Sequence, residues 1–348
     1  MALIERECVR RRGWLTREQF LDLLGIANLI PGPTSTELAM HVGYHRAGWL
    51  GLAAAGVAFI APAALMVGLL AALYVKGADV SLVRAVMLAV QPAVLVVVLD
   101  AILPLARTAL TAPKMMVIGV ASLAAVAAGL PAIAVLLLAG LASLVTHRTA
   151  LAAMIVTLGT AAVIAAQSTS APGASMWELF AYFVRTGSLL FGSGYVLLPV
   201  LEHDLVQHRA WLTGRQLLDA FAVGQATPGP VFTTATFVGY LIGGVPFAVV
   251  ATIGMFLPAF VCSALAAPYV RRLRTYAPAR RFLGGVNAAA VALIGWVLIT
   301  LGRDVLVAPL QLVILAAAAG LVFLVRINPG FVLVGAAAVG VAASLAGI

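Results

Sequence analysis

Charged residues are scarce in this chain. Of its 348 residues, 9% are Asp, Glu, Lys or Arg and 63% are hydrophobic, whereas a soluble domain carries roughly 25% charged residues. So little charge can serve a folded chain only if lipid replaces water over most of its surface. Many apolar stretches approach the ~20 residues that a helix needs to cross hydrocarbon. The composition therefore predicts an all-α, multi-pass membrane protein.

Cysteines and catalytic motifs are also nearly absent. Cys8 and Cys262 are the only cysteines, which excludes a disulfide framework and a thiolate metal site. The sequence has no Walker A loop, nucleophile elbow or HExxH motif, so ATP-driven transport and membrane proteolysis have no support. The histidines lack the spacing of metal ligands. We expect no cofactor, no metal and no enzymatic activity.

The net charge of +9 does not indicate nucleic-acid binding. The basic residues lie in short loops between apolar stretches, where they anchor and orient membrane helices. The charged start of the chain is not followed by the apolar core of a signal peptide. Membrane lipid is the expected surroundings; the sequence leaves the oligomeric state open, a homodimer included.

The chain repeats itself. An offset of 197 places Trp14-Leu15-Thr16 on Trp211-Leu212-Thr213 and the first Pro-Gly-Pro on the second, and an offset of 196 places Pro62-Ala63 on Pro258-Ala259. Matches at a fixed offset over so long a stretch indicate a duplicated unit. We predict a first repeat over 1–146, a connecting apolar segment and linker over 147–175, and a second repeat over 176–348.

Together the repeats contain about 11 to 12 hydrophobic segments. The stretch 177–198, with its Gly192-Ser193-Gly194 break, has its counterpart before residue 1, so the first repeat is expected to lack its opening helix and the true start to lie upstream. Counting segments favours an inverted second repeat. The loop charges favour inversion if the broken segments are re-entrant and parallel repeats if they cross the membrane.

Each repeat contains a helix that its own sequence interrupts. Proline lacks the N–H that a helix needs, and the residue before it avoids the α region. Each Pro-Gly-Pro therefore predicts that one helix ends and a second begins, while Pro62 is expected to kink the helix that follows. The freed N–H groups of a restarting helix attract anions, and paired broken helices mark the binding site of many transporters.

We therefore predict an oxyanion site built from both interruptions and from the glycine-rich break. Backbone donors and hydroxyls without fixed charge suit a tetrahedral oxyanion that must be bound and then released. A purely structural kink, with hydroxyls bonded back to carbonyls, is the competing interpretation. The predicted substrate-binding residues are Asn28, Pro31, Gly32, Pro33, Thr34, Ser35, Thr36, Gly192, Ser193, Gly194, Gln225, Thr227, Pro228, Gly229, Pro230, Thr233 and Thr234.

Glu37 is a carboxylate one turn into an apolar segment, where a charge is expensive and points to function. It could carry a proton for coupling, pair with His41, or merely favour the start of its helix. Gln91 and Asn287 form a matched amide pair, for which structural hydrogen bonds between helices are as plausible as a role in binding.

At these residues the chain resembles the two-domain chromate ion transporter family. The resemblance rests on Arg12-Gly13-Trp14-Leu15, on the stretch from Asn28 to Leu38, on Phe191-Gly192-Ser193-Gly194 and on Gln225 to Pro230. It implies inner-membrane export of chromate, with a link to sulfate, chromate resistance, and halves of opposite orientation. The alternatives are a transporter of sulfate or another small anion, and a membrane scaffold without transport. A scaffold would not need two matched breaks with hydroxyls.

Overall fold

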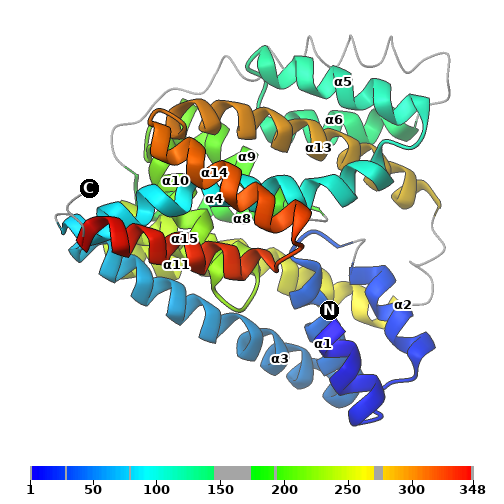
Figure 1. The fold of residues 1–348 in the computed structure, drawn as a ribbon. Coiled ribbons are helices and arrows are strands. Elements are labelled where there is room, and N and C mark those ends of the chain that lie inside the picture. The colour runs from blue at the N-terminus through cyan, green and yellow to red at the C-terminus, as the bar shows by residue number, and fades with distance from the viewer. Residues whose placement is uncertain are drawn as a thin grey trace.

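A computed structural model describes residues 2–27, 30–77, 80–144, 174–191, 194–269 and 277–345. These residues form helices and no strand; an isolated antiparallel bridge joins Pro31 to Phe191. The all-α prediction is confirmed (Figure 1). Most of the predicted connecting segment, 147–175, lies outside the described residues, as do Asn28, Gly192 and Ser193 of the predicted site.

The helices fall into two series. The first is α1 (Ala2–Glu5), the π-helix η1 (Arg6–Arg11), α2 (Arg17–Ala27), α3 (Thr34–Lys76), α4 (Ser81–Ala109), α5 (Pro113–Ala127) and α6 (Ala132–Leu144). The second is α8 (Met176–Leu189), η2 (Gly194–Val196), α9 (Leu197–Leu201), η3 (Glu202–His208), α10 (Gly214–Ala226), η4 (Val231–Thr233), α11 (Thr234–Ala266), η5 (Ala267–Tyr269), α13 (Ala277–Val305), α14 (Pro309–Ala319), η6 (Gly320–Leu324) and α15 (Pro329–Leu345).

The structure repeats at the offsets seen in the sequence. Helices α4 and α13 are both 29 residues long, and α13 begins at residue 277, which is 81 plus 196. Helices α5 and α14 both begin at a proline that supplies a preorganised first turn, Pro113 and Pro309. Even the short π-helices η1 and η3 fall at matched positions. The prediction of two homologous halves is confirmed.

The long helices α3 and α11 kink at matched residues. Ala47 and Gly48 have φ of −144° and 58°, and Gly243 and Gly244 have φ of −157° and 72°. A positive φ is open to glycine, which has no Cβ, and so the glycine sets the position of the bend. Pro62, where a kink was expected, lies inside α3 without a departure from helical dihedrals; the non-helical residues of this helix are Ala47 and Gly48.

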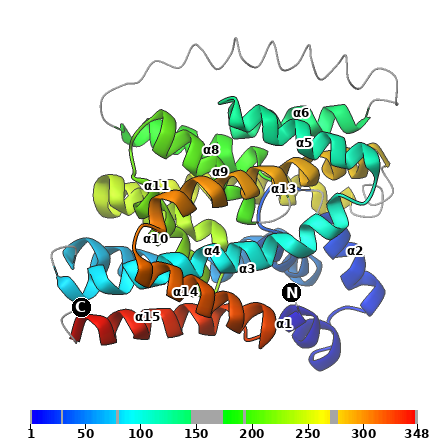
Figure 2. The same cartoon turned by 45° about the horizontal axis from the view of Figure 1, so that its top comes forward.

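The halves interleave through reciprocal contacts. Helix α4 of the first half packs along α15 of the second, and α13 of the second half packs along α6 of the first. Since α4 corresponds to α13 and α6 to α15, one contact is the image of the other. Figures 1 and 2 show the two assemblies, α15 beside α4 and α13 beside α5 and α6. Such reciprocity is what a pseudo-two-fold axis between the halves produces.

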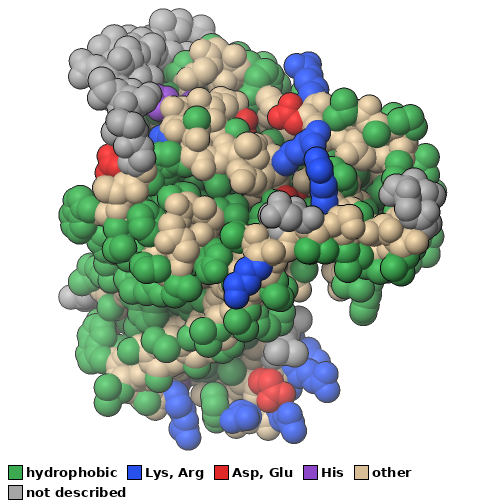
Figure 3. Space-filling view, turned by 90° about the vertical axis from the view of Figure 1, so that its left-hand side faces the viewer, with side chains coloured by type: hydrophobic (Ala, Val, Ile, Leu, Met, Phe, Trp, Pro, Cys, Tyr) green, Lys and Arg blue, Asp and Glu red, His purple; other side chains and the backbone are tan. Residues whose placement is uncertain are grey.

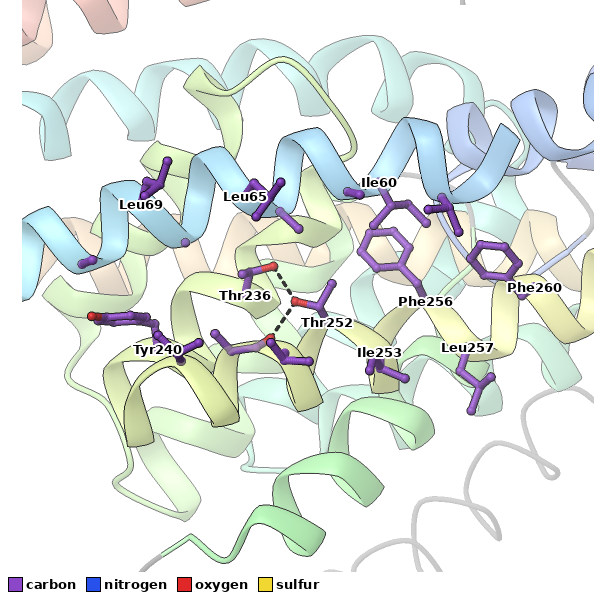
Figure 4. Close-up of a pocket in the computed structure, with 18 residues that line it drawn as sticks. Ile60, Leu65, Leu69, Thr236, Tyr240, Thr252, Ile253, Phe256, Leu257 and Phe260 are labelled. Carbon is purple, nitrogen blue, oxygen red and sulfur yellow. Dashed lines mark hydrogen bonds between the residues drawn. The ribbon is translucent and has the colours of Figure 1, made fainter. Parts of the chain in front are cut away.

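Helices α3 and α11 meet at this axis and run antiparallel. A Cβ on Gly56 would touch the ring of Phe260, whereas one on Gly68 would lie 3.8 Å from Cγ2 of Thr236. Residue numbers thus rise along α3 as they fall along α11, which Figure 4 shows from Leu69 to Ile60 beside the run from Thr252 to Phe260. The equivalent helices of the two halves therefore point in opposite directions.

Four of the described helices are long and apolar enough to cross a membrane by length and composition: α3, α4, α11 with its η4 extension, and α13. The helices α5, α6, α14 with η6, and α15 are apolar but shorter. Figure 3 shows hydrophobic side chains over most of the face that it presents, with Lys and Arg in separate groups. The chain is a multi-pass membrane protein of the inner membrane.

Two adjacent glycines of α13 test the packing between the halves. A Cβ on Gly285 would overlap the carbonyl oxygen of Ala139 and lie 2.7 Å from Cβ of Ser143, both on α6. Gly285→Ala should lower the melting temperature in detergent by several degrees, because overpacking typically costs about 1–3 kcal/mol. Gly284→Ala is the control, since a Cβ there meets nothing within 4 Å. Equal melting temperatures for the two variants would contradict the α6–α13 contact.

Candidate anion site at the two Pro-Gly-Pro turns

Both Pro-Gly-Pro segments form the same turn between two helices. Helix α2 ends at Ala27 and α3 begins at Thr34, while α10 ends at Ala226 and the chain becomes helical again at Val231. The central glycines have φ of 134° at Gly32 and 153° at Gly229, and a residue with a side chain would be strained at these angles. The second proline of each turn is extended, with ψ of 111° at Pro33 and 133° at Pro230.

Each turn rests on the long helix of the other half. A Cβ on Gly32 would lie 3.0 Å from Cβ of Ala259 in α11, and a Cβ on Gly229 would overlap Cβ of Ala63 in α3. Ala63 and Ala259 are themselves a matched pair, because 63 plus 196 is 259. Both alanines are 1% exposed. The two turns are therefore placed symmetrically about the α3–α11 crossing.

The end of α8 brings the glycine-rich break to the turns. The N–H of Gly32 donates to the carbonyl oxygen of Leu190 at 2.8 Å, beside the Pro31–Phe191 bridge. A Cβ on Gly194 would lie 3.1 Å from Cβ of Val231, the first residue of the second restart. The segment after α8 thus contacts the first turn at one end and the second restart at the other.

The two turns differ in burial. Gly32 is buried and its equivalent Gly229 is exposed, whereas the second prolines, Pro33 and Pro230, are both buried. Equivalent parts of the two repeats therefore have unequal access to the surroundings.

Glu37 lies over the first turn. Its side chain is fully buried, and a Cβ on Gly32 would overlap its Oε1. Neither of its carboxyl oxygens, nor either ring nitrogen of His41, has a hydrogen-bond partner within the described residues. The two side chains are therefore not bonded to each other, although they lie one turn apart. A buried carboxyl group that no donor satisfies is aimed at the Pro-Gly-Pro backbone.

Most hydroxyls of the second turn bond to their own backbone. Thr227 donates to the carbonyl of Val223 at 2.7 Å, Thr233 to that of Pro230 at 2.8 Å, and Thr234 to that of Val231 at 2.7 Å. These are the local bonds that threonine makes at helix ends. Each of these hydroxyls already donates its proton to a backbone carbonyl, so towards a ligand it could act only as an acceptor.

Two polar side chains at the turns, Thr36 and Gln225, have atoms without hydrogen-bond partners among the described residues. Oγ1 of Thr36 is buried and unbonded within the described residues. Gln225 accepts from the hydroxyl of Tyr195 at 3.4 Å, and its Nε2 donor is buried without a partner there. Thr34 is buried and Ser35 partly exposed at the start of α3. Buried polar groups in proteins are otherwise nearly always bonded, so Oγ1 of Thr36 and Nε2 of Gln225 are open to a ligand.

The sequence reasoning missed a second buried polar cluster. Asp219 in α10 accepts from Nε2 of Gln91 in α4 at 2.8 Å and from the hydroxyl of Tyr74 in α3 at 2.9 Å. The available signals were the matches of Asp219 with Asp22 and of Gln91 with Asn287. A sequence match does not show which helices meet, and so the cluster was not foreseen.

Two homologous halves, each with a helix interrupted against the other half, are the architecture of many transporters built from repeats. Comparison with known proteins is more specific. The family model "Chromate transporter" matches residues 1–144 and 177–341. The chain belongs to the chromate transporter family.

Three relatives cover most of the chain. A "Chromate transport protein" of Cupriavidus metallidurans is 30% identical over 98% of this chain and 87% of its own length. One of Pseudomonas aeruginosa is 33% identical over 86% of this chain and 76% of its own length. A "Probable chromate transport protein" of Synechococcus elongatus is 28% identical over 86% of this chain and 79% of its own length. No solved structure matches the chain.

The contact of the second turn with α3 can be tested by a size exchange. Gly229→Ala should destabilise the protein by about 1–3 kcal/mol, because its φ of 153° strains an alanine and its Cβ overlaps Ala63. Adding Ala63→Gly should restore part of the lost melting temperature. If Ala63→Gly lowers the melting temperature equally with and without Gly229→Ala, the two residues are not in contact.

Proposed function

We propose that the chain exports chromate across the inner membrane and so confers chromate resistance. The main observation behind this proposal is that each Pro-Gly-Pro turn packs against the long helix of the other half, the first at Ala259 and the second at Ala63. It supports a single site shared by the halves. Membership of the family and the names of the relatives favour chromate as the oxyanion.

The proposed site binds an oxyanion between the two turns. Neither Pro-Gly-Pro segment contains Lys or Arg, so the donors are the backbone N–H groups of the restarts, Nε2 of Gln225 and the hydroxyl of Thr36. Thr233 and Thr234 join only if they turn away from their own carbonyls. Neutral donors recognise an oxyanion by its charge and tetrahedral shape. Chromate and sulfate share both, so sulfate is expected to compete with chromate for the site or to exchange with it.

The halves would move the oxyanion by alternating access. Antiparallel α3 and α11 support an inverted arrangement, in which rocking of equivalent halves exposes one site to either side in turn. The unequal burial of the two turns supports this too, since inverted halves must differ in any state that is open to one side.

The membrane potential can drive this export without another energy source. It is negative inside and is worth about 2.3 kcal/mol per charge for each 100 mV, hence about 4.6 kcal/mol for a dianion. Glu37, buried against the first turn, is the candidate to couple a cation or proton to the oxyanion.

The proposal is tested by flux of radiolabelled chromate and sulfate in proteoliposomes. Replacing Thr36 and Gln225, the two named side-chain donors, together by alanine should reduce flux or affinity at least about tenfold, the value of one lost hydrogen bond to a charged group. Thr252→Ala is the matched control: its hydroxyl bonds Thr236 and the carbonyl of Ala248, each at 2.7 Å, in the groove between α3 and α11 (Figure 4), and it belongs to neither Pro-Gly-Pro segment.

If the variant lacking both side-chain donors is folded and transports both oxyanions with unchanged rate and affinity, the proposed site is wrong. If wild type carries sulfate but not chromate, the site stands and the substrate assignment fails.

A further inference from the structure

Asp219 is an acid buried at the junction of the two halves. It is 3% exposed and lies in α10, the helix that leads into the second Pro-Gly-Pro turn. Its partners Tyr74 and Gln91 belong to the first half. An acid inside a membrane protein is costly and marks function by default.

The hydrogen-bond partners of Asp219 are neutral side chains, Tyr74 and Gln91. No ion pair involves Asp219 among the described residues. Among the charged or titratable groups on the described elements around α10, Tyr74 interacts with Asp219 through a hydrogen bond and Arg215 through its charge. Arg215 lies one turn earlier on the same helix; its side chain is exposed and donates to the backbone oxygen of Asp304 at 3.3 Å. A structural salt bridge therefore does not account for the buried carboxyl.

The hydrogen bonds of Asp219 suit both of its protonation states. As a carboxylate it accepts from Nε2 of Gln91 at Oδ1 and from the hydroxyl of Tyr74 at Oδ2. If a proton from water joins Oδ2, the carboxylic acid can donate to the same phenol oxygen, because a phenol both donates and accepts. The Gln91 bond is unchanged. The group can gain or lose a proton without losing a bond.

The position of the acid connects this proton to the transport path. Helix α10 ends at Ala226, seven residues beyond Asp219 and therefore roughly 10 Å further along the helix. The turn that seats on Ala63 follows directly. Because both bonds of Asp219 reach into the first half, its charge changes at the contact between the halves, where they would move against each other.

We propose that Asp219, held between Tyr74 and Gln91, binds and releases a proton in each transport cycle and so couples oxyanion movement to proton movement. This inference rests on the proposed transport function and adds its coupling ion. Tyr74 and Gln91 are positioning residues.

The test uses the full chain in proteoliposomes at a clamped membrane potential, with sulfate or chromate flux measured with and without a pH gradient of one unit. Wild-type flux should change by about threefold or more, out of the tenfold that one proton can supply. Asp219→Asn should abolish this response, although asparagine retains both hydrogen bonds. Asp22→Asn, the matched and partly exposed acid of the first half, should respond as wild type does.

Tyr74→Phe separates proton binding from simple packing. It removes one bond to Asp219 while keeping the ring, and so should shift the pH at which flux is half-maximal. A structural tether would lower the amount of folded protein without moving that pH.

The outcomes distinguish the two proposals. If wild type shows no oxyanion flux, the proposed function fails. If wild type transports and Asp219→Asn keeps the full response to the pH gradient, or wild type shows no response at all, the proton-binding role of Asp219 is overturned and the transport function stands.

Discussion

The structure depends on the contact between a glycine turn of one half and an alanine of the other. A backbone turn inside a membrane must be enclosed by protein or water, since lipid satisfies none of its polar groups. Here each turn packs against the opposite half: Gly32 on Ala259 and Gly229 on Ala63. The absence of a Cβ on the glycine and the small size of the alanine permit this approach. Neither half could shelter its own interruption in this way.

The reciprocal helix contacts follow from the same constraint. Once each turn seats on the other half, α3 and α11 must cross near their matched residues, and the outer helices then interleave as α4 with α15 and α6 with α13. The contact also places the unpaired polar groups of the first turn, Thr36 and Glu37, at the boundary of the halves rather than within one. A site divided in this way can open only when the halves move.

The repeat and the positions of the Pro-Gly-Pro interruptions follow from the sequence because they depend on local chemistry. Proline and glycine act on their own backbone, and an offset is visible without a fold. The break at Gly48 was not predicted, because a glycine inside a helical pattern is tolerated without a bend. The bonds of Thr233 and Thr234 to nearby carbonyls, and the meeting of Asp219 with Tyr74 and Gln91, depend on packing that no single segment encodes.

Chromate flux in proteoliposomes with either turn altered tests the central claim, that both turns form one oxyanion site, most directly. The variants are Gly32→Ala and Gly229→Ala, compared per amount of folded protein with Gly284→Ala as the control. If the turns form one site, each of the two substitutions reduces flux to a similar degree while the control transports as wild type does. Wild-type flux in a folded protein with either turn substituted would contradict a shared site.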